Sequence, residues 1–317
     1  RARRITNRSP KRADDPSSLF VPLFAENAMN TSQKKMPADQ KTLVRSLVKW
    51  GDDCRAQGRY QQAEALYRKA LTAAETVFGP DHIEVSALLN NLAVLYKYTG
   101  NFDEAERLYR RALATTEAKL GADHPNVATL YHNLGGLEHA RGRHSAGEPF
   151  ARRSVEIREK ALGANHVDVA ADIAALAAIL DGQKKYDESE PLYHRALAIF
   201  ERAYGPEHYE IAVNLNNLAA VKNAQGKTAE AERLYRRALA IKEKLLGAGQ
   251  CSLADVAMTL NNLAVLLKKQ EKYEEAGANY QKALAIFERM LDPSHPKIIT
   301  CRKNYTALLG RMERVAA

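Results

Sequence analysis

Cysteine is scarce in this chain, and it never recurs at a spacing typical of disulfide frameworks or metal sites. The three residues, Cys54, Cys251 and Cys301, stand far apart. A C-x-x-C pair is therefore absent, and nothing suggests a stapled secreted domain. We expect a protein of a reducing compartment, the cytoplasm, with no metal site.

Motifs for catalysis and segments for membrane insertion are also missing. No apolar run reaches 18 residues, so we expect no membrane span. The sequence has no phosphate-binding glycine loop, no G-x-S-x-G and no H-E-x-x-H. Acidic residues and histidines are scattered, so we expect no enzyme, no catalytic residue and no cofactor. A hidden enzyme site is the remaining alternative, and a closed cavity with strongly shifted pKa values would reveal it.

Charge is unevenly distributed along the chain. The net charge is +9, and residues 1–38 contribute +5 of it. This segment is rich in Arg, Ser, Pro and Asn and lacks a sustained helical period. We predict that residues 1–38 form a disordered basic tail, and we do not expect nucleic acid as a partner.

What the sequence does contain is a repeat of 42 residues. His82, His124, His166 and His208 are spaced at this interval, and the residues between them recur with them. The chain reads N-N-L-A-V-L-Y from Asn90 and N-N-L-A-A-V-K from Asn216, three repeats later. Self-similarity at a fixed period of tens of residues is typical of stacked identical units. Such a solenoid offers an extended surface and few enclosed pockets.

Each repeat predicts two amphipathic helices joined by a short turn, because apolar residues recur at intervals of three and four. Glycine falls between the two helices and again after the second, where a left-handed cap suits it. Stacked helices lie about 8–10 Å apart, whereas zinc needs its donor atoms within about 2.0–2.1 Å. Histidines one repeat apart therefore cannot share a metal ion, and we expect them to cap helices instead. The predicted pairs cover about residues 39–79, 82–121, 124–163, 166–205, 208–247 and 253–291, followed by a capping helix at 296–314.

A regular series of small and aromatic residues carries a family resemblance. In the second repeat the series is Ala93, Tyr96, Gly100, Phe102, Ala105, Tyr109 and Ala112. It resembles the tetratricopeptide repeat, and the 42-residue period with N-N-L-A and G-x-D-H-P is similar to the kinesin light chain type. The resemblance covers about residues 39–317 and implies an all-α, right-handed superhelical solenoid that binds other proteins. No heptad run precedes residue 39, so we do not expect a motor subunit.

The third repeat departs from the series. It has Glu138, His144, Gly147, Ala151 and Ser154 where the second repeat has Tyr96, Phe102, Ala105, Tyr109 and Ala112. Loss of a packed aromatic side chain costs about 3–5 kcal/mol where the gap cannot collapse. We therefore expect the stack to be loosest in this repeat.

The resemblance places the first helix of each pair on a concave groove, which identifies candidate binding residues. Asparagine is prominent among them, and its amide can pair with the backbone of an extended peptide because it donates and accepts. The alternative is that these amides hold neighbouring helices in register. The predicted groove residues are Asn90, Asn91, Lys97, His132, Asn133, His139, Ala174, Ala175, Asn216, Asn217, Asn223, Asn261, Asn262 and Lys268.

Two functions are compatible with this pattern. The first is a non-enzymatic module that binds a protein or peptide partner with acidic residues, because Arg45, Lys49 and Arg55 add positive charge to the groove. The second is a scaffold that self-assembles into a homo-oligomer through its convex face or the ends of the solenoid.

Overall fold

The computed structural model describes residues 38–293 and 295–316, and its described part contains thirteen α-helices and no strand. The tail predicted for residues 1–38 lies outside the described residues, apart from Ala38 at the start of the first helix. None of the described helices combines the length and apolar character needed to cross a bilayer. The predicted all-α repeat solenoid is confirmed.

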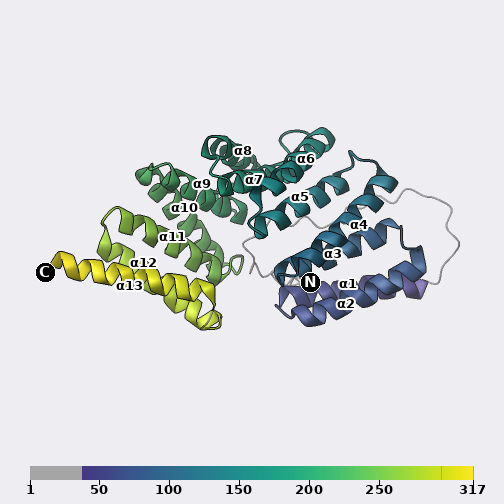
Figure 1. Ribbon diagram of the computed structural model, residues 1–317, viewed down its shortest axis with the longest axis horizontal. Helices are drawn as coiled ribbons and strands as arrows, with labels where there is room; N and C mark the ends of the chain where they lie inside the picture. Colours follow the sequence, from purple (N-terminus) through teal and green to yellow (C-terminus); the bar gives the residue numbers. More distant parts are fainter. Residues whose placement is uncertain (1–37, 294, 317) are drawn as a thin grey trace, which may run out of the picture. The chain divides into compact units, whose positions relative to one another are not determined.

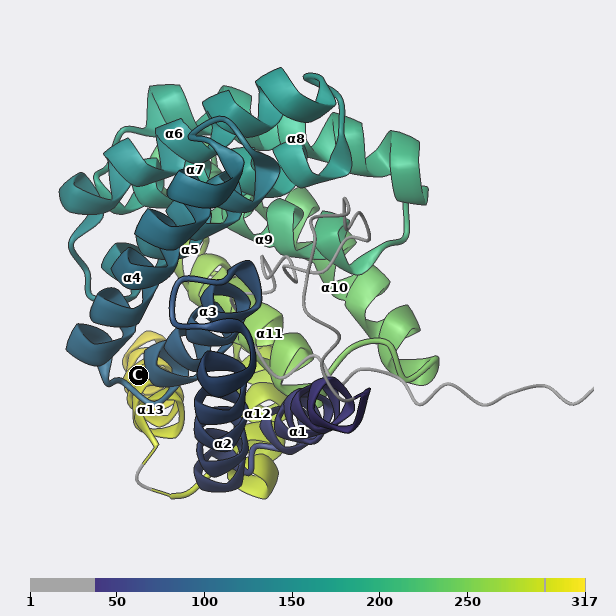
Figure 2. The same ribbon diagram turned by 90° about the vertical axis from the view of Figure 1, so that its right-hand side faces the viewer.

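The described chain forms two compact units. The N-terminal unit comprises residues 38–199, and the C-terminal unit comprises residues 200–316. In the N-terminal unit the helices follow one another in pairs along the stack (Figures 1 and 2). Its helices are α1 (Ala38–Ala56), α2 (Tyr60–Phe78), α3 (Ile83–Tyr98), α4 (Phe102–Leu120), α5 (Pro125–Ala140), α6 (His144–Leu162), α7 (Val167–Gly182) and most of α8 (Tyr186–Tyr204).

The C-terminal unit continues the same pairing. It contains the end of α8, then α9 (Tyr209–Ala224), α10 (Thr228–Gly247), α11 (Leu253–Lys269), α12 (Tyr273–Met290) and α13 (Pro296–Ala316). The link between α10 and α11 differs from the other links because Ser252, rather than a histidine, caps α11.

A column of tyrosines forms part of the core between paired helices. Tyr67, Tyr109, Tyr193 and Tyr280 are fully buried, and Tyr235 is nearly so. The Tyr67 hydroxyl donates to Asp52 Oδ1 at 2.6 Å. The buried hydroxyls of Tyr109, Tyr193 and Tyr280 have no hydrogen-bond partner in the described part of the chain. The regular spacing of these tyrosines is therefore explained by packing in the core of successive helix pairs.

Histidine begins four of the first helices. Each imidazole Nδ1 accepts a hydrogen bond from the backbone N–H two residues later, at 3.1–3.3 Å. The side chain thereby satisfies one of the amides that every helix N-terminus leaves unpaired. The predicted capping role is confirmed for His82, His124, His166 and His208.

Left-handed backbone separates the two helices of a pair. Gly58, Gly100 and Gly142 have φ values of 72°, 78° and 73°. The equivalent positions in two other repeats are Lys184, at 62°, and Glu271, at 64°. A side chain in this region of φ/ψ space costs free energy, so the turn is imposed by the flanking helices.

The third pair, expected from its sequence to be the loosest, packs closely at its glycines. A β-carbon added to Gly147 of α6 would lie only 3.0 Å from the Gly135 carbonyl oxygen of α5. One added to Gly135 would lie 3.3 Å from the Ala151 backbone nitrogen. The small residues let the two backbones approach closely at these positions. A pocket of about 470 Å³ remains at the start of α6, where His144, Ser145 and Ala146 face Gly182 and Gln183 of the next link.

Successive second helices are joined by a recurring contact. In the N-terminal unit Leu113 of α4 packs against Val127 of α5 and Ile157 of α6. Four residues beyond the leucine position, a glutamate pairs with an arginine of the next second helix. The pairs are Glu75–Arg111 at 2.7 Å, Glu159–Arg195 at 2.6 Å and, in the C-terminal unit, Glu201–Arg237 at 2.6 Å.

Candidate functional site

The predicted groove positions of the N-terminal unit divide into a buried set and an accessible set. Asn90, Asn91, His132 and Asn133 are at most 7% exposed. The small residues Ala174 and Ala175 of α7 are buried as well. Side chains this deeply buried are not available to a partner.

The buried amides join neighbouring first helices. Asn133 Nδ2 of α5 donates to Asn90 Oδ1 of α3 at 2.8 Å. In the C-terminal unit Asn262 Nδ2 of α11 approaches Asn216 Oδ1 of α9 at 3.4 Å. The same bond in both units supports the alternative interpretation, in which these asparagines hold the stack in register. The partners are other amides, not the backbone carbonyls of the neighbouring helix.

A charged network replaces the amide ladder where α7 has alanines. Asp172 of α7 accepts from Arg158 Nε of α6 at 2.6 Å and lies 2.7 Å from His132 Nδ1 of α5. The Arg158 guanidinium also donates to Thr129 Oγ1 at 3.1 Å. Three helices are thus tied together by fully buried groups, and each charge has partners that compensate its desolvation.

The C-terminal unit buries a cation at the same register. Lys242 of α10 is 84 residues beyond Arg158, and its Nζ donates to Thr259 Oγ1 at 3.0 Å and to the Asp255 carbonyl oxygen at 3.3 Å. Burial lowers the pKa of this lysine. Ala74 and Phe200, which occupy the same position in other repeats, are apolar. The charged residues Arg158 and Lys242 at an otherwise uncharged position could therefore have indicated a buried ion pair or hydrogen-bond network, but this signal was not used in the sequence-based prediction.

The accessible set of the N-terminal unit lies one turn further along the first helices. A β-carbon on Gly136 of α5 would lie 3.8 Å from Lys97 Nζ of α3, so the lysine reaches its neighbour. His139 Nδ1 lies 3.1 Å from His144 Nδ1. Burial, His144 and Lys97 together lower the pKa of His139. The structure therefore brings these predicted residues together, and it adds His144.

Exposed positive charge extends this set along α1. Arg45 and Lys49 are exposed on the helix, and Arg55 at its C-terminal end is partly exposed. Burial raises the pKa of Asp181 on α7, whereas the nearby His144 opposes that shift. The accessible predicted positions on α1, α3 and α5 carry Arg, Lys or His side chains, but Asp52 and Asp53 of α1 lie beside Arg55, and Asp52 is 3.9 Å from its guanidinium.

In the C-terminal unit the predicted residues are half-buried. The side chains that are partly exposed there are those of Asn217, Asn223, Asn261 and Lys268. Lys269 donates to both the carbonyl and the side-chain oxygen of Asn223, at 3.3 and 3.2 Å. This lysine was not predicted, although it stands directly after Lys268 in the sequence.

Titratable groups do not gather into a catalytic or metal-binding cluster in the described part of the chain. No group of three His, Cys, Asp or Glu side chains there could hold a metal ion. Burial raises the pKa of Glu210 to about 7, and that of the Cys251 thiol to about 11. Burial alone accounts for the shift of Glu210. Cys251 lies beside Asp255, which also raises its pKa, and Lys242, which opposes that shift. A raised thiol pKa disfavours the reactive thiolate.

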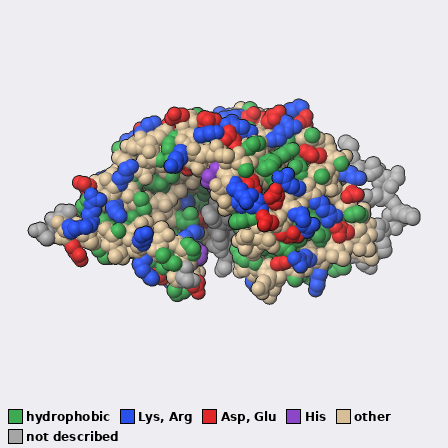
Figure 3. Space-filling view, viewed as in Figure 1, with side chains coloured by type: hydrophobic (Ala, Val, Ile, Leu, Met, Phe, Trp, Pro, Cys, Tyr) green, Lys and Arg blue, Asp and Glu red, His purple; other side chains and the backbone are tan. Residues whose placement is uncertain are grey.

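The surface outside these positions carries mixed charge. Acidic and basic side chains are interspersed over the N-terminal unit in Figure 3. Many of them form ion pairs between repeats, such as Arg141 with Glu106 at 2.6 Å and Lys185 with Glu148 at 2.8 Å. On the face seen in Figure 3 these ion pairs intersperse the two signs of charge over the N-terminal unit.

Comparison with known proteins gives a repeat family along nearly the whole described chain. The tetratricopeptide repeat model matches residues 42–118, 85–160, 126–186, 169–244 and 255–317. No curated protein matches the sequence.

Several solved structures share the fold. BtubC (BKLC) from P. vanneervenii is 24% identical, with a TM-score of 0.56 over 82% of this chain and 95% of that one. A putative kinesin light chain from Podosopora anserina, with nearly identical TPR-like repeats, is 22% identical, with a TM-score of 0.54 over 67% and 99% of the two chains. The type IV pilus biogenesis factor PilW is 16% identical, with a TM-score of 0.56 over 81% and 97%. At these identities the likeness shows the fold alone.

Proposed function

Because the chain belongs to the tetratricopeptide repeat family, we propose that it is a non-enzymatic module that binds an extended, acidic segment of a partner protein. Proteins of this family are generally interaction modules, and no catalytic family is indicated. The segment would lie in the groove predicted along the first helices, with α1, α3 and α5 providing most of the contacts.

The observation that carries this proposal is the row of accessible basic groups on the first helices. Arg45 and Lys49 are exposed on α1, and the partly exposed Lys97 of α3 lies one repeat after Arg55. Basic groups of one sign along a surface attract an acidic partner and orient its approach. The amide ladder serves this arrangement indirectly, because it fixes the spacing of the helices that carry the charges.

Titration of a labelled acidic peptide library tests the proposal. We expect Arg45→Glu/Lys49→Glu to weaken binding at least tenfold, because the two reversals turn attraction into repulsion. Lys119→Glu/Arg143→Glu changes the net charge equally at residues outside the first helices, so this matched control should bind like the wild type.

Two outcomes would count against the groove. Equal loss in both double variants would show that only the net charge matters, and no loss in either would show that the first helices do not bind. The buried amides provide a further distinction. Asn133→Ala should lower the free energy of unfolding more than the affinity for the peptide, since the Asn133 amide pairs with Asn90 and not with a ligand.

A further inference from the structure

The first helix pair exposes apolar residues at positions that every later repeat buries. Leu43 is 49% exposed and Trp50 is 55% exposed. In the later repeats both positions are at most 4% exposed. The equivalents of Leu43 are Val85, Val127, Val169, Ile211 and Val256, and those of Trp50 are Leu92, Leu134, Leu176, Leu218 and Leu263.

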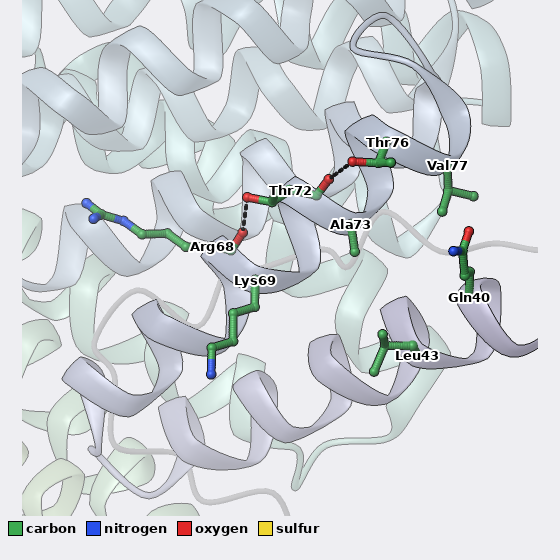
Figure 4. A pocket seen from close by; sticks show the side chains of 8 residues that line it. All are labelled: Gln40, Leu43, Arg68, Lys69, Thr72, Ala73, Thr76 and Val77. Carbon is green, nitrogen blue, oxygen red and sulfur yellow. Dashed lines mark hydrogen bonds between the residues drawn. The ribbon is translucent and has the colours of Figure 1, made fainter.

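A pocket of about 470 Å³ accompanies this exposure, between α1 and α2. Figure 4 shows Gln40 and Leu43 on α1, with Lys69, Thr72, Ala73, Thr76 and Val77 along α2. Ala73 occupies the register position of the larger Ile157, Ile199 and Ile241. The short alanine side chain therefore helps to leave the pocket open.

The later repeats show what fills the equivalent space. Leu113, from the second helix of the preceding pair, packs against Val127 and Ile157, which are the equivalents of Leu43 and Ala73. The preceding repeat's Leu71 likewise packs against the core cluster that contains Val85. The pocket beside α1 therefore lies where, in the later repeats, one aliphatic side chain of the preceding second helix packs.

Lys69 stands where later repeats place the basic partner of an ion pair between repeats. It holds the register position of Arg111 and Arg195, which pair with Glu75 and Glu159 of the preceding second helices. Lys69 is exposed and makes no ion pair within residues 38–293 and 295–316. In those second helices the glutamate follows the aliphatic residue by four positions, as Leu71 and Glu75 show.

We propose that the α1–α2 end face is a docking site for an amphipathic helix of another protein that carries an aliphatic residue and, four positions later, a glutamate. The aliphatic side chain enters the pocket beside Leu43 and Ala73, and the glutamate pairs with Lys69. Residues 1–37 do not contain this pattern, because their one glutamate, Glu26, follows Pro22 at that spacing. The site is distinct from the first-helix groove, and neither depends on the other.

A peptide with the sequence of α2, Tyr60–Phe78, is a suitable probe because it presents Leu71 and Glu75 in the geometry that covers the next repeat. Isolated helices of this length are marginal in water. The labelled peptide therefore carries a lactam between Lys69 and Ala73→Glu, on the side opposite Leu71. We expect saturable binding to the full chain by fluorescence anisotropy, and at least tenfold loss with Leu71→Asp in the peptide or Leu43→Asp in the protein.

Charge exchange tests the paired lysine. Lys69→Glu should weaken binding about fivefold, as expected when a partly exposed ion pair worth up to about 1 kcal/mol is lost. Glu75→Lys in the peptide should restore the affinity of this variant. The control Lys49→Glu alters the first-helix groove and should leave peptide binding unchanged.

Three results would overturn the proposal. They are the absence of binding, binding that is indifferent to Leu71 and Leu43, and equal weakening by Lys49→Glu. A fourth is self-association abolished by Leu43→Asp or Leu309→Asp, since Leu309 and Glu313 of α13 have the same spacing and a second copy would then be the occupant.

Discussion

Histidine at the N-cap makes the first turn of four helices sensitive to protonation. Only an unprotonated Nδ1 can accept the backbone N–H, and burial lowers the pKa of His82, His124 and His208. A histidine whose pKa is lower in the folded state is protonated first in the unfolded chain. Its contribution is therefore intact above about pH 6.5 and declines as the pH falls below that value.

We predict that between pH 7.5 and pH 5.5 the free energy of unfolding changes less favourably for the wild type than for His82→Asn/His124→Asn/His208→Asn. Glu210, with a pKa raised to about 7, shifts stability in the opposite direction equally in both proteins. Asparagine caps helices without titrating. Urea denaturation monitored by circular dichroism at the two pH values measures both effects. The same pH dependence in the triple variant would show that other groups are responsible.

Lys184 and Glu271 occupy the left-handed turn where other repeats have glycine. Replacing either residue by glycine removes the clash of the β-carbon in this region, although it loosens the unfolded chain. We expect Lys184→Gly and Glu271→Gly each to raise the free energy of unfolding by about 0.5–1 kcal/mol. Lys185→Gly, one position later, should instead destabilise the chain, because its Nζ pairs with Glu148.

At the residue scale the sequence predicted repeated features well and singular ones poorly. The histidine caps and the tyrosine column recur every 42 residues, so their role could be read from the period. Arg158 and Asp172 occur once, and nothing in a single sequence brings them together. The exposure of the asparagines was also not predictable, because a residue beside a groove can contact either the ligand or the next helix.

Packing between helices was predicted where the residues are large and missed where they are small. The third repeat lacks aromatics, which suggested a weak pair, but Gly135 and Gly147 let α5 and α6 approach closely. The charged network of Arg158, Asp172 and His132 then fastens this pair to α7. The middle repeat is held by close backbone contact and buried charge rather than by aromatic volume.

We predict that Asp172→Ala destabilises the chain by about 3–5 kcal/mol, because it leaves the Arg158 guanidinium buried without a counter-charge. Arg158→Leu/Asp172→Leu should recover much of that loss, since no uncompensated charge remains. Arg152→Ala, which breaks half-exposed pairs with Glu148 and Glu188, should cost less than about 1 kcal/mol. Chemical denaturation of the three variants measures the differences, and equal losses for Asp172→Ala and Arg152→Ala would contradict the account.

For the whole molecule, binding in the groove and self-assembly make opposite predictions about mass. A binding module should remain a monomer of 35.2 kDa as its concentration rises. A scaffold should grow, and Leu309→Asp in α13 should disrupt it because Leu309 is 40% exposed and can contact a second copy. Multi-angle light scattering from low to high concentration distinguishes the two.

The central claim is that a partner segment lies along the first helices, and photo-crosslinking tests it most directly. An acidic peptide with a diazirine at successive positions would be irradiated with the full chain, and the adducts would be mapped by mass spectrometry. The account predicts adducts on α1, α3 and α5, around Lys49, Lys97 and His139. Adducts confined to α2, α4 and α6 would contradict it.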